Sequence, residues 1–318
     1  MKLQEIYDLI IKKGLEKDPR SKKEIRDTLK SARSRFNKLA PIDKRFFDRD
    51  ELRHPFSDTR ILYGKPEAEI RTIMVGIDLG GEELLTAYTL NKEGLGVDLA
   101  MSHHPSGRAL VNLYNVMRVQ ANMLEKTGVR SEIADDIVKK RMEEVMRRFS
   151  SINAERAIDT ARLLGIPLMC AHTPADNHVN KFLQDLFDKK KPNTIKDALN
   201  ILKNIPEYQD GMRKGAGPSV VAGDEKKKCG KVFVDMTGGT EGSKKVFSRL
   251  SQAGISTVVG MHFSEEHVKT AKSEYVHLIV AGHIASDNLG LNLLLDEVSR
   301  KGGINIIPCS GFIRIKRK

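Results

Sequence analysis

Three apolar runs that end in histidine limit the possible folds of this chain more than any other feature. The first run closes with Ser102-His103-His104-Pro105, the second extends from Pro167 to His172, and the third extends from Val276 to His283. Each has the length and the apolar content of a buried strand. Because parallel sheets flanked by helices place their sites just beyond the carboxyl ends of the strands, we expect these imidazoles to gather at one sheet edge.

An aspartate follows two of these histidines after four residues. Asp176 follows His172, and Asp287 follows His283. On a helix, side chains at this spacing lie on one face. Imidazoles mixed with carboxylates suit Mn, Fe, Co, Ni or Zn better than Mg or Ca, so the pattern predicts a metal site. The alternative, in which these residues cap helices, bond within the core or form a hydrogen-bonded turn, stays open.

The segments around the motifs alternate between strand and helix patterns. A strand at 71–77 exits through Asp78, a short helix covers 82–90, and the strand at 97–102 carries the double histidine. Strand, helix and strand at this spacing form a βαβ unit, which favours an α/β fold with a mainly parallel sheet flanked by helices. A second α/β series starts at residue 231 and includes a last strand near 304–307.

The chain of 318 residues is long enough for two compact units. We divide it into a helical extension and linker, a first α/β domain with a strand-free helical excursion, and a second α/β region, at residues 1–60, 61–205 (excursion 106–165) and 206–318.

Composition excludes several classes of protein. The three cysteines, Cys170, Cys229 and Cys309, form no paired motif, so neither a disulfide framework nor a thiolate zinc site is indicated. No apolar run approaches the roughly 18 to 20 residues that cross a bilayer, and the first residues lack the apolar segment of a signal peptide. We therefore expect a soluble cytoplasmic protein without a membrane partner.

The formal net charge is +12, and about half of it lies in the first sixty residues. A basic surface attracts anions such as nucleotides or RNA. The alternative is that these lysines and arginines lie on solvated helix faces, since the segment has little of the aromatic interleaving that single-strand binding uses.

A glycine-rich turn follows the strand at 231–236. Gly238, Gly239 and Gly242 leave backbone N–H groups that could bind a phosphate or carboxylate of a ligand. A tight strand-to-helix turn that needs small residues explains them equally well. The other five histidines have no comparable context and are expected to be structural or superficial, with His267 the least certain of them: His54, His178, His262, His267 and His277.

The three motifs, in this order, resemble those of the NIF-three-like family of dinuclear metal proteins, members of which are often described as GTP cyclohydrolase I type 2. They stand here as Ser102-His103-His104-Pro105, His172-Thr173-Pro174-Ala175-Asp176 and Gly282-His283-Ile284-Ala285-Ser286-Asp287. The resemblance covers most of residues 60–290.

The resemblance implies two α/β domains, two metal ions in the cleft between them, and a ring-shaped homo-hexamer. It also implies that Asp176 bridges the ions and that His172 lies close behind the ligands. The five residues that the resemblance makes ligands are His103, His104, Asp176, His283 and Asp287. The chain departs from the family in three places. Its last ligand is Asp287 instead of glutamate, and the family's early tryptophan-aspartate-asparagine-glycine element is not evident around Asp58. The N-terminal helices and the excursion at 106–165 exceed the common pattern of the family.

These features predict a metal-dependent hydrolase. Two cations roughly 3.5–4 Å apart can share a water, lower its pKa and polarise the substrate. Asp78 and His172 are candidate proton acceptors, or groups that orient the metal ligands. We expect an anionic, nucleotide-type substrate, GTP cyclohydrolase-like by resemblance. The alternatives are a non-catalytic, oligomeric metal-binding regulator or scaffold, and a protein that binds nucleic acid.

Overall fold

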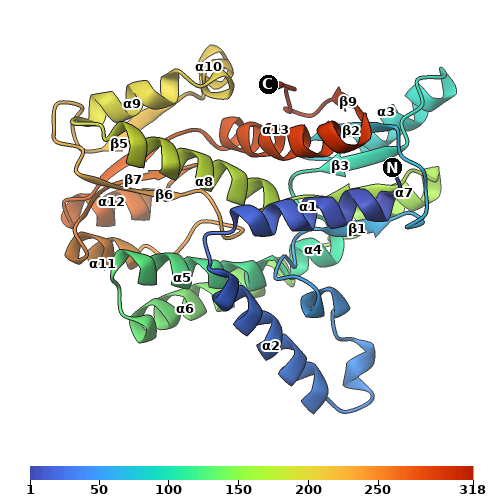
Figure 1. Cartoon of the computed structure of the whole chain (residues 1–318), viewed down its shortest axis with the longest axis horizontal. Helices are drawn as coiled ribbons and strands as arrows, with labels where there is room; N and C mark the ends of the chain where they lie inside the picture. Colours follow the sequence, from blue (N-terminus) through green and yellow to red (C-terminus); the bar gives the residue numbers. More distant parts are fainter. Residues whose placement is uncertain (318) are drawn as a thin grey trace.

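The structure, a computed structural model, describes residues 1–317 and contains two β-sheets with helices between and around them (Figure 1). The first sheet has the order β1-β4-β3-β2-β9 and the second the order β5-β8-β7-β6. The strands are β1 (Arg60–Tyr63), β2 (Thr72–Gly76), β3 (Leu99–Ser102), β4 (Leu168–Cys170), β5 (Ser219–Ala222), β6 (Lys231–Asp235), β7 (Ile255–Gly260), β8 (His277–Val280) and β9 (Asn305–Pro308). The expected α/β class with mainly parallel sheets is confirmed.

The two sheets repeat one plan. In each, an antiparallel edge strand, β1 or β5, borders three parallel strands that follow the same relative order. Gly76, Ser102 and Cys170 align across the end of the first sheet, as Asp235, Gly260 and Val280 do across the second. The chain therefore contains two alike halves, each of which presents its strand ends to the site.

The helices cover both sheets and form the layer between them. They are α1 (Leu3–Lys17), α2 (Lys22–Lys38), α3 (Gly81–Lys92), α4 (Gly107–Val111), α5 (Arg118–Thr127), α6 (Ser131–Phe149), α7 (Arg156–Leu164), α8 (Thr173–Lys190), α9 (Ile195–Lys203), α10 (Pro206–Arg213), α11 (Val246–Gln252), α12 (Glu265–Ser273) and α13 (His283–Gly302). The strand-free excursion at 106–165 is confirmed, since it consists of α4 to α7 and a short 3-10 helix.

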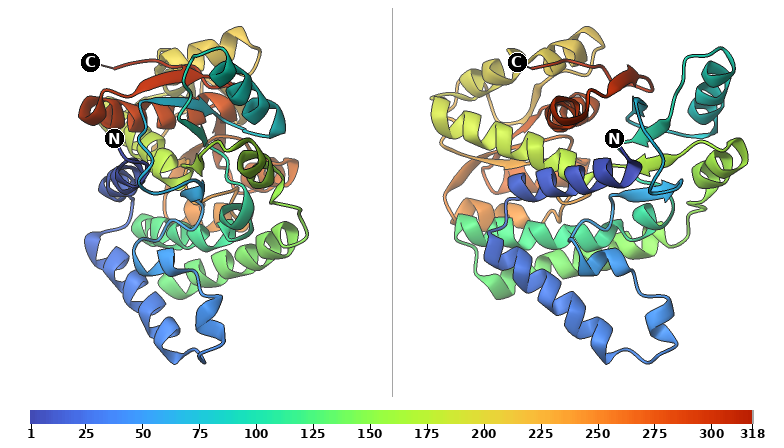
Figure 2. Two further views of the ribbon diagram at one scale, coloured as in Figure 1. Left: turned by 90° about the vertical axis from the view of Figure 1, so that its right-hand side faces the viewer. Right: turned by 45° about the vertical axis from the view of Figure 1, so that its right-hand side comes forward.

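Helices α8 and α13 pack directly against each other in the centre of the molecule, and α1 lies against both (Figures 1 and 2). Their crossing is close because Gly290 has no side chain: a Cβ there would lie 2.4 Å from the carbonyl oxygen of Ala175. Each helix follows the fourth strand of its half and begins with a candidate ligand pair. The close crossing thus brings the two pairs together.

The two N-terminal helices differ in how they are held. Leu3, Ile6 and Ile10 of α1 are fully buried in the core of the first sheet, whereas Ala32 is the one buried residue of α2. Helix α2 and the following short turns project from the body as an arm (Figure 2). We call residues 18–53 the arm. Helix α1 therefore belongs to the core, although the sequence pattern placed it in a helical extension.

Three strand assignments needed correction. The last strand, β9, pairs with β2 in the first sheet instead of completing the second region, because the chain returns after α13. The edge strands β1 and β5 were not among the strands expected from the sequence; both are four residues long and only partly buried. The proposed boundary near residue 206 stays a prediction. Among residues 1–317, no helix has the length and hydropathy to span a bilayer.

Candidate metal centre

Two histidines leave the end of β3 in a fixed turn. The His103 N–H donates to the carbonyl of Gly76, and the His104 N–H donates to the carbonyl of Ile77, both at 2.9 Å. These bonds continue the ladder between β3 and β2 for two residues beyond the strand. His103 is fully buried and His104 partly buried, so the two rings are held at the sheet edge.

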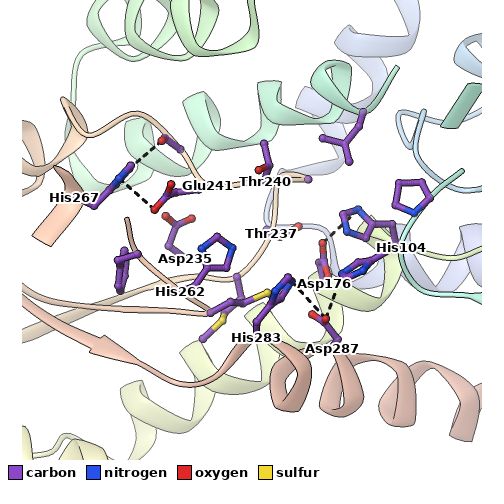
Figure 3. A pocket seen from close by; sticks show the side chains of 18 of the residues that line it. His104, Asp176, Asp235, Thr237, Thr240, Glu241, His262, His267, His283 and Asp287 are labelled. Carbon is purple, nitrogen blue, oxygen red and sulfur yellow. Dashed lines mark hydrogen bonds and ion pairs between the residues drawn. The ribbon is translucent and has the colours of Figure 1, made fainter. Parts of the chain in front are cut away.

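Asp287 lies between the histidines of the two halves. Its Oδ1 is 3.4 Å from Nε2 of His103, and its Oδ2 is 3.5 Å from Nε2 of both His104 and His283. Figure 3 shows His104, His283 and Asp287 meeting at one end of a cavity. The carboxylate therefore faces two separate sets of imidazole nitrogens with its two oxygens.

Asp176 occupies a more one-sided position. Its Oδ1 is 3.4 Å from Nε2 of His103, and its Oδ2 is 3.9 Å from Nδ1 of His172. Neither oxygen approaches His104 or His283 as Asp287 does. The two carboxylates thus have different surroundings, although both stand in the first turn of a central helix.

Four buried atoms of this cluster have no hydrogen-bond partner: Nε2 of His103, Oδ1 of Asp176 and both carboxylate oxygens of Asp287. Buried polar atoms are nearly always satisfied, so four that converge on one point indicate room for a cation. Candidate ligand atoms within 4.8 Å of one another fall into three groups: His103 with His104 and His172, His104 with His283 and Asp287, and His103 with Asp176 and Asp287. The donor set fits a divalent transition metal.

Three of the rings are oriented by hydrogen bonds at Nδ1, on the side of the ring away from the cluster. Nδ1 of His103 bonds to the carbonyl of Ala171 at 3.1 Å, Nδ1 of His104 to Oδ1 of Asp78 at 2.8 Å, and Nδ1 of His172 to Oδ2 of Asp58 at 2.8 Å. Metal-binding histidines commonly carry such a partner, which leaves Nε2 free to face the ion. The arrangement suits metal binding and places Asp78 behind a ligand.

Asp58 is the important residue that the sequence did not identify. It is fully buried and also accepts a hydrogen bond from Oγ1 of Thr173 at 2.6 Å. Burial opposes its ionisation, yet the hydrogen bonds from His172 and Thr173 hold the pKa of Asp58 below its ordinary value. It follows Phe56 and Ser57 in the place where the family element was sought, but without the expected tryptophan.

The electrostatics of the cluster favour added positive charge. Burial opposes protonation of His104, but the nearby carboxylates of Asp287 and Asp78 raise its pKa to about 9. Burial also opposes ionisation of Asp287, while the charges of the neighbouring His103 and His104 rings lower its pKa strongly. Protons on the histidines stabilise the carboxylates here. A divalent cation that displaced those protons would also stabilise the carboxylates.

A cavity of about 370 Å³ extends from the cluster towards the second sheet. His104, His172, Asp176, His283 and Asp287 line its near end. The lining residues, all within 1–317, include no lysine or arginine. The positive charge of the sequence is thus located outside this cavity.

The glycine-rich turn has a packing role that the sequence left as an alternative. Gly238 and Gly239 have φ values of +108° and +82°, and a Cβ on Gly238 would lie 2.7 Å from Cγ of Gln120. Nε2 of Gln120 donates to the carbonyls of Gly238 and Thr240, at 3.3 and 2.8 Å. Gly239 and Gly242 line the cavity, but α11 begins only at Val246. The turn therefore holds the cavity wall against α5.

Three of the histidines expected to be structural have ordinary partners. Nε2 of His54 bonds to the Tyr7 hydroxyl at 2.7 Å, and Nδ1 of His178 bonds to the carbonyl of Pro174 at 2.7 Å. His267 bonds to the Ser264 hydroxyl and to the carbonyl of Gly242.

His262 and His277 differ from these and from each other. His277 is half-buried in β8, outside the cavity lining. His262 lines the cavity, with its ring centroid 5.0 Å from that of His283. Its position two residues after β7 matches that of His104 after β3, so the internal repeat is the signal that could have identified it.

Comparison with solved structures identifies the fold. A NIF3 superfamily protein from Sphaerobacter thermophilus is 27% identical, with a TM-score of 0.69 over 82% of this chain and 94% of that one. Reduced HcgD from Methanocaldococcus jannaschii is 16% identical over 78% and 87% of the two chains, with a TM-score of 0.45. A Bacillus cereus protein related to NIF3 is 13% identical over 90% and 98%, with a TM-score of 0.41.

No protein-family model and no curated protein matches the chain. The likeness to the Sphaerobacter protein extends over nearly the whole of that protein. It includes the α/β fold on which the three histidine motifs meet, and it agrees with the resemblance that those motifs carry. The fold and the three histidine motifs of this chain are thus those of a NIF-three-like, or NIF3-like, protein.

Proposed function

We propose that this protein is a metal-dependent hydrolase with a dinuclear centre bridged by Asp287. The observation that supports the proposal is that both oxygens of Asp287 are buried and unbonded, and that each faces a different set of histidine nitrogens. A carboxylate that bridges two ions uses its oxygens in this way. The resemblance gave the bridge to Asp176, and the distances favour Asp287 instead.

The two halves of the site would each hold one ion. His103, Asp176 and Oδ1 of Asp287 would bind the first, and His104, His283 and Oδ2 of Asp287 the second. These nitrogen and carboxylate ligands suit Zn, Fe, Mn, Co or Ni. His172, whose Nδ1 is bonded to Asp58, would direct Nε2 towards the first two histidines.

Two such ions, when bound, lower the pKa of a shared water and polarise the bond that it attacks. The chain's own residues would orient the metal-binding rings and move protons. Asp78 accepts a hydrogen bond from Nδ1 of His104 and keeps Nε2 of that ring directed at the cluster. His172, fixed by Asp58, lines the cavity and would hold or accept a proton at Nε2 if it is not itself a ligand.

The substrate would be anionic and of nucleotide type, GTP cyclohydrolase-like by resemblance. Because the cavity lining has no lysine or arginine, an anionic group of the substrate would have to lie against the metal ions. The turn that contains Gly238, Gly239 and Gly242 would border the substrate through its backbone, since the last two glycines line the cavity.

We also propose self-association, as the resemblance implies a homo-hexamer. The arm carries large apolar side chains in water: Ile42 is 61% and Phe46 is 73% exposed. Such exposure on a projecting segment suits contact between copies. Light scattering on the intact chain should give six times the mass of one chain, and Phe46→Glu should lower it; a monomer in the unaltered protein would refute the proposal.

Hydrolysis is tested by supplying the protein with each candidate metal and a panel of nucleotides and phosphoesters. We expect turnover of at least one nucleotide, and its loss in His104→Ala. His277→Ala is the matched control, because His277 lies outside the cavity lining. Two ions per chain without turnover of any compound would refute the hydrolase and favour the non-catalytic regulator or scaffold.

A further inference from the structure

The far end of the cavity contains a second charged cluster that the metal centre does not use. Asp235 ends β6 and Glu241 lies in the turn that follows, and in Figure 3 their side chains lie close together at the side of the cavity away from Asp287. Both line the cavity, as do His262 and His267. One continuous space therefore connects the metal centre to a pair of carboxylates.

The two carboxylates are held differently. Oε1 of Glu241 accepts a hydrogen bond from the Ser264 N–H at 2.6 Å and lies 3.2 Å from Nδ1 of His267. Among the hydrogen bonds and ion pairs of residues 1–317, none involves the carboxylate of Asp235. Burial, together with the charge of Glu241, raises the pKa of Asp235 to about 6. Nε of Arg141 donates to the backbone carbonyl of Glu241 at 3.2 Å, but no lysine or arginine within residues 1–317 forms an ion pair with either carboxylate.

Aromatic side chains form the adjacent wall. Phe247 and Phe263 line the cavity and meet in an edge-to-face arrangement, with ring centroids 6.4 Å apart. A flat cation gains from contact with aromatic rings as well as from a carboxylate. The far end thus combines negative charge with an apolar, planar surface.

A third metal ion is a poorer occupant. Within residues 1–317, the three groups of candidate ligand atoms that approach within 4.8 Å all lie at the His103 end, and none includes Asp235 or Glu241. In the described part of the chain, the far end therefore offers no set of three ligand atoms for a metal ion.

We infer that Asp235 and Glu241 bind a planar cationic nitrogen group of the substrate, of the amidinium or guanidinium type, at the end of the cavity opposite the metal centre. The inference rests on the proposed function, since the same substrate would place its anionic group at the metal ions. It adds a requirement for the end of the substrate that is far from the metal ions: that end must carry a positive charge and paired N–H donors.

The probes are benzamidine and benzamide, which have nearly the same shape but differ in charge. Calorimetric titration of the metal-loaded protein at pH 7.5 should show benzamidine binding at least about tenfold tighter than benzamide. Asp235→Asn should weaken benzamidine binding by about tenfold or more and leave benzamide binding unchanged. Glu225→Gln removes an exposed carboxylate outside the cavity lining and is the matched control, with no expected effect.

Equal affinity for the two probes, or unchanged benzamidine binding in Asp235→Asn, would overturn the inference. Tight binding of a neutral nucleoside that is lost in Asp235→Asn, without discrimination between the probes, would also overturn it, because the site would then select N–H donors without charge. Binding of Zn²⁺ at a third position that Asp235→Asn removes would do the same.

Failure of this inference is distinguishable from failure of the proposed function. Asp235→Asn should retain the full metal content of the unaltered protein, since it touches none of the proposed ligands. Metal-free protein should still prefer benzamidine to benzamide. Absence of the preference for benzamidine in the unaltered protein, with its metal content intact, overturns only the inference, whereas absence of metal in the unaltered protein refutes the proposed function alone.

Discussion

Oδ2 of Asp58 lies 2.8 Å from Nδ1 of His172, a hydrogen bond that joins residues 114 positions apart in the chain. It links the segment before β1 to the start of α8, directly behind the cluster. The bond fixes the ring of His172 so that Nε2 faces the other histidines. Asp58 is not in any of the groups of candidate ligands found among residues 1–317, but it bonds to a member of one of them, His172.

Asp58→Asn should weaken metal binding without abolishing it. The amide keeps the size of the side chain but loses the charge that holds Nδ1–H of His172, and loss of such a partner typically costs about 10–100-fold in metal affinity. Titration with Zn²⁺ against a competing chelator measures the change. Asp224→Asn, at an exposed turn, is the control. Equal affinities of Asp58→Asn and the unaltered chain would show that Asp58 does not orient the site.

Gly290→Ala should separate α8 from α13. The new Cβ would lie 2.4 Å from the carbonyl oxygen of Ala175, which is backbone and cannot rotate away. We expect a loss of about 1–3 kcal/mol in the free energy of unfolding, typical of overpacking, and weaker metal binding because Asp176 and Asp287 move apart.

Urea denaturation and metal titration measure the two effects of Gly290→Ala. Gly81→Ala is the control, because a Cβ at Gly81 meets nothing closer than 3.7 Å. A Gly290→Ala protein as stable as Gly81→Ala, with unchanged metal affinity, would be inconsistent with a close crossing.

Asp235→Asn should stabilise the protein at alkaline pH. The pKa of Asp235 rises from 3.8 to about 6 on folding, so ionising it costs more in the folded than in the unfolded chain. The cost is absent below pH 3.8, grows between pH 4 and 6, and is complete above pH 6, at about 1–3 kcal/mol.

The free energy of unfolding of metal-free protein, measured at pH 4 and pH 8, tests this sign. The free energy of unfolding of the variant should exceed that of the unaltered chain at pH 8, and the two values should lie closer together at pH 4. A variant that is less stable at pH 8 would mean that the carboxylate makes a favourable contact in the folded chain.

Ile6→Ala should destabilise the fold strongly, in contrast to Ile42→Ala. Ile6 is 0% exposed in the core of the first sheet, and removing a buried isoleucine side chain costs about 2–5 kcal/mol. Ile42 on the arm is 61% exposed, so Ile42→Ala should lower the free energy of unfolding little when the protein is dilute. Thermal unfolding of both variants measures the difference. Similar melting temperatures would show that α1 is not part of the core.

The central features of the site could be predicted because they are local in sequence. An apolar strand that ends in histidine predicts that the histidine lies at the end of the sheet, where sites form. A spacing of four residues places His283 and Asp287 on one helix face. The α/β class followed from the same alternation of strands and helices. These signals need no knowledge of how distant segments meet.

Other features depend on distant contacts and left no local signal. The partner of β9 is decided by how the chain returns after α13, and β1 and β5 are too short and too exposed to show a strand pattern. The role of Asp58 arises from its contact with His172, far along the chain. How Asp176 and Asp287 lie relative to each other depends on the helix crossing at Gly290, which no spacing within either motif reveals.

Metal analysis of the purified chain beside Asp287→Ala tests the central claim most directly. We expect two divalent transition-metal ions per chain in the unaltered protein, and at most one in Asp287→Ala, because both halves of the site share that carboxylate. An unaltered protein that takes up no metal, or an Asp287→Ala protein that still holds two ions, would contradict a centre bridged by Asp287.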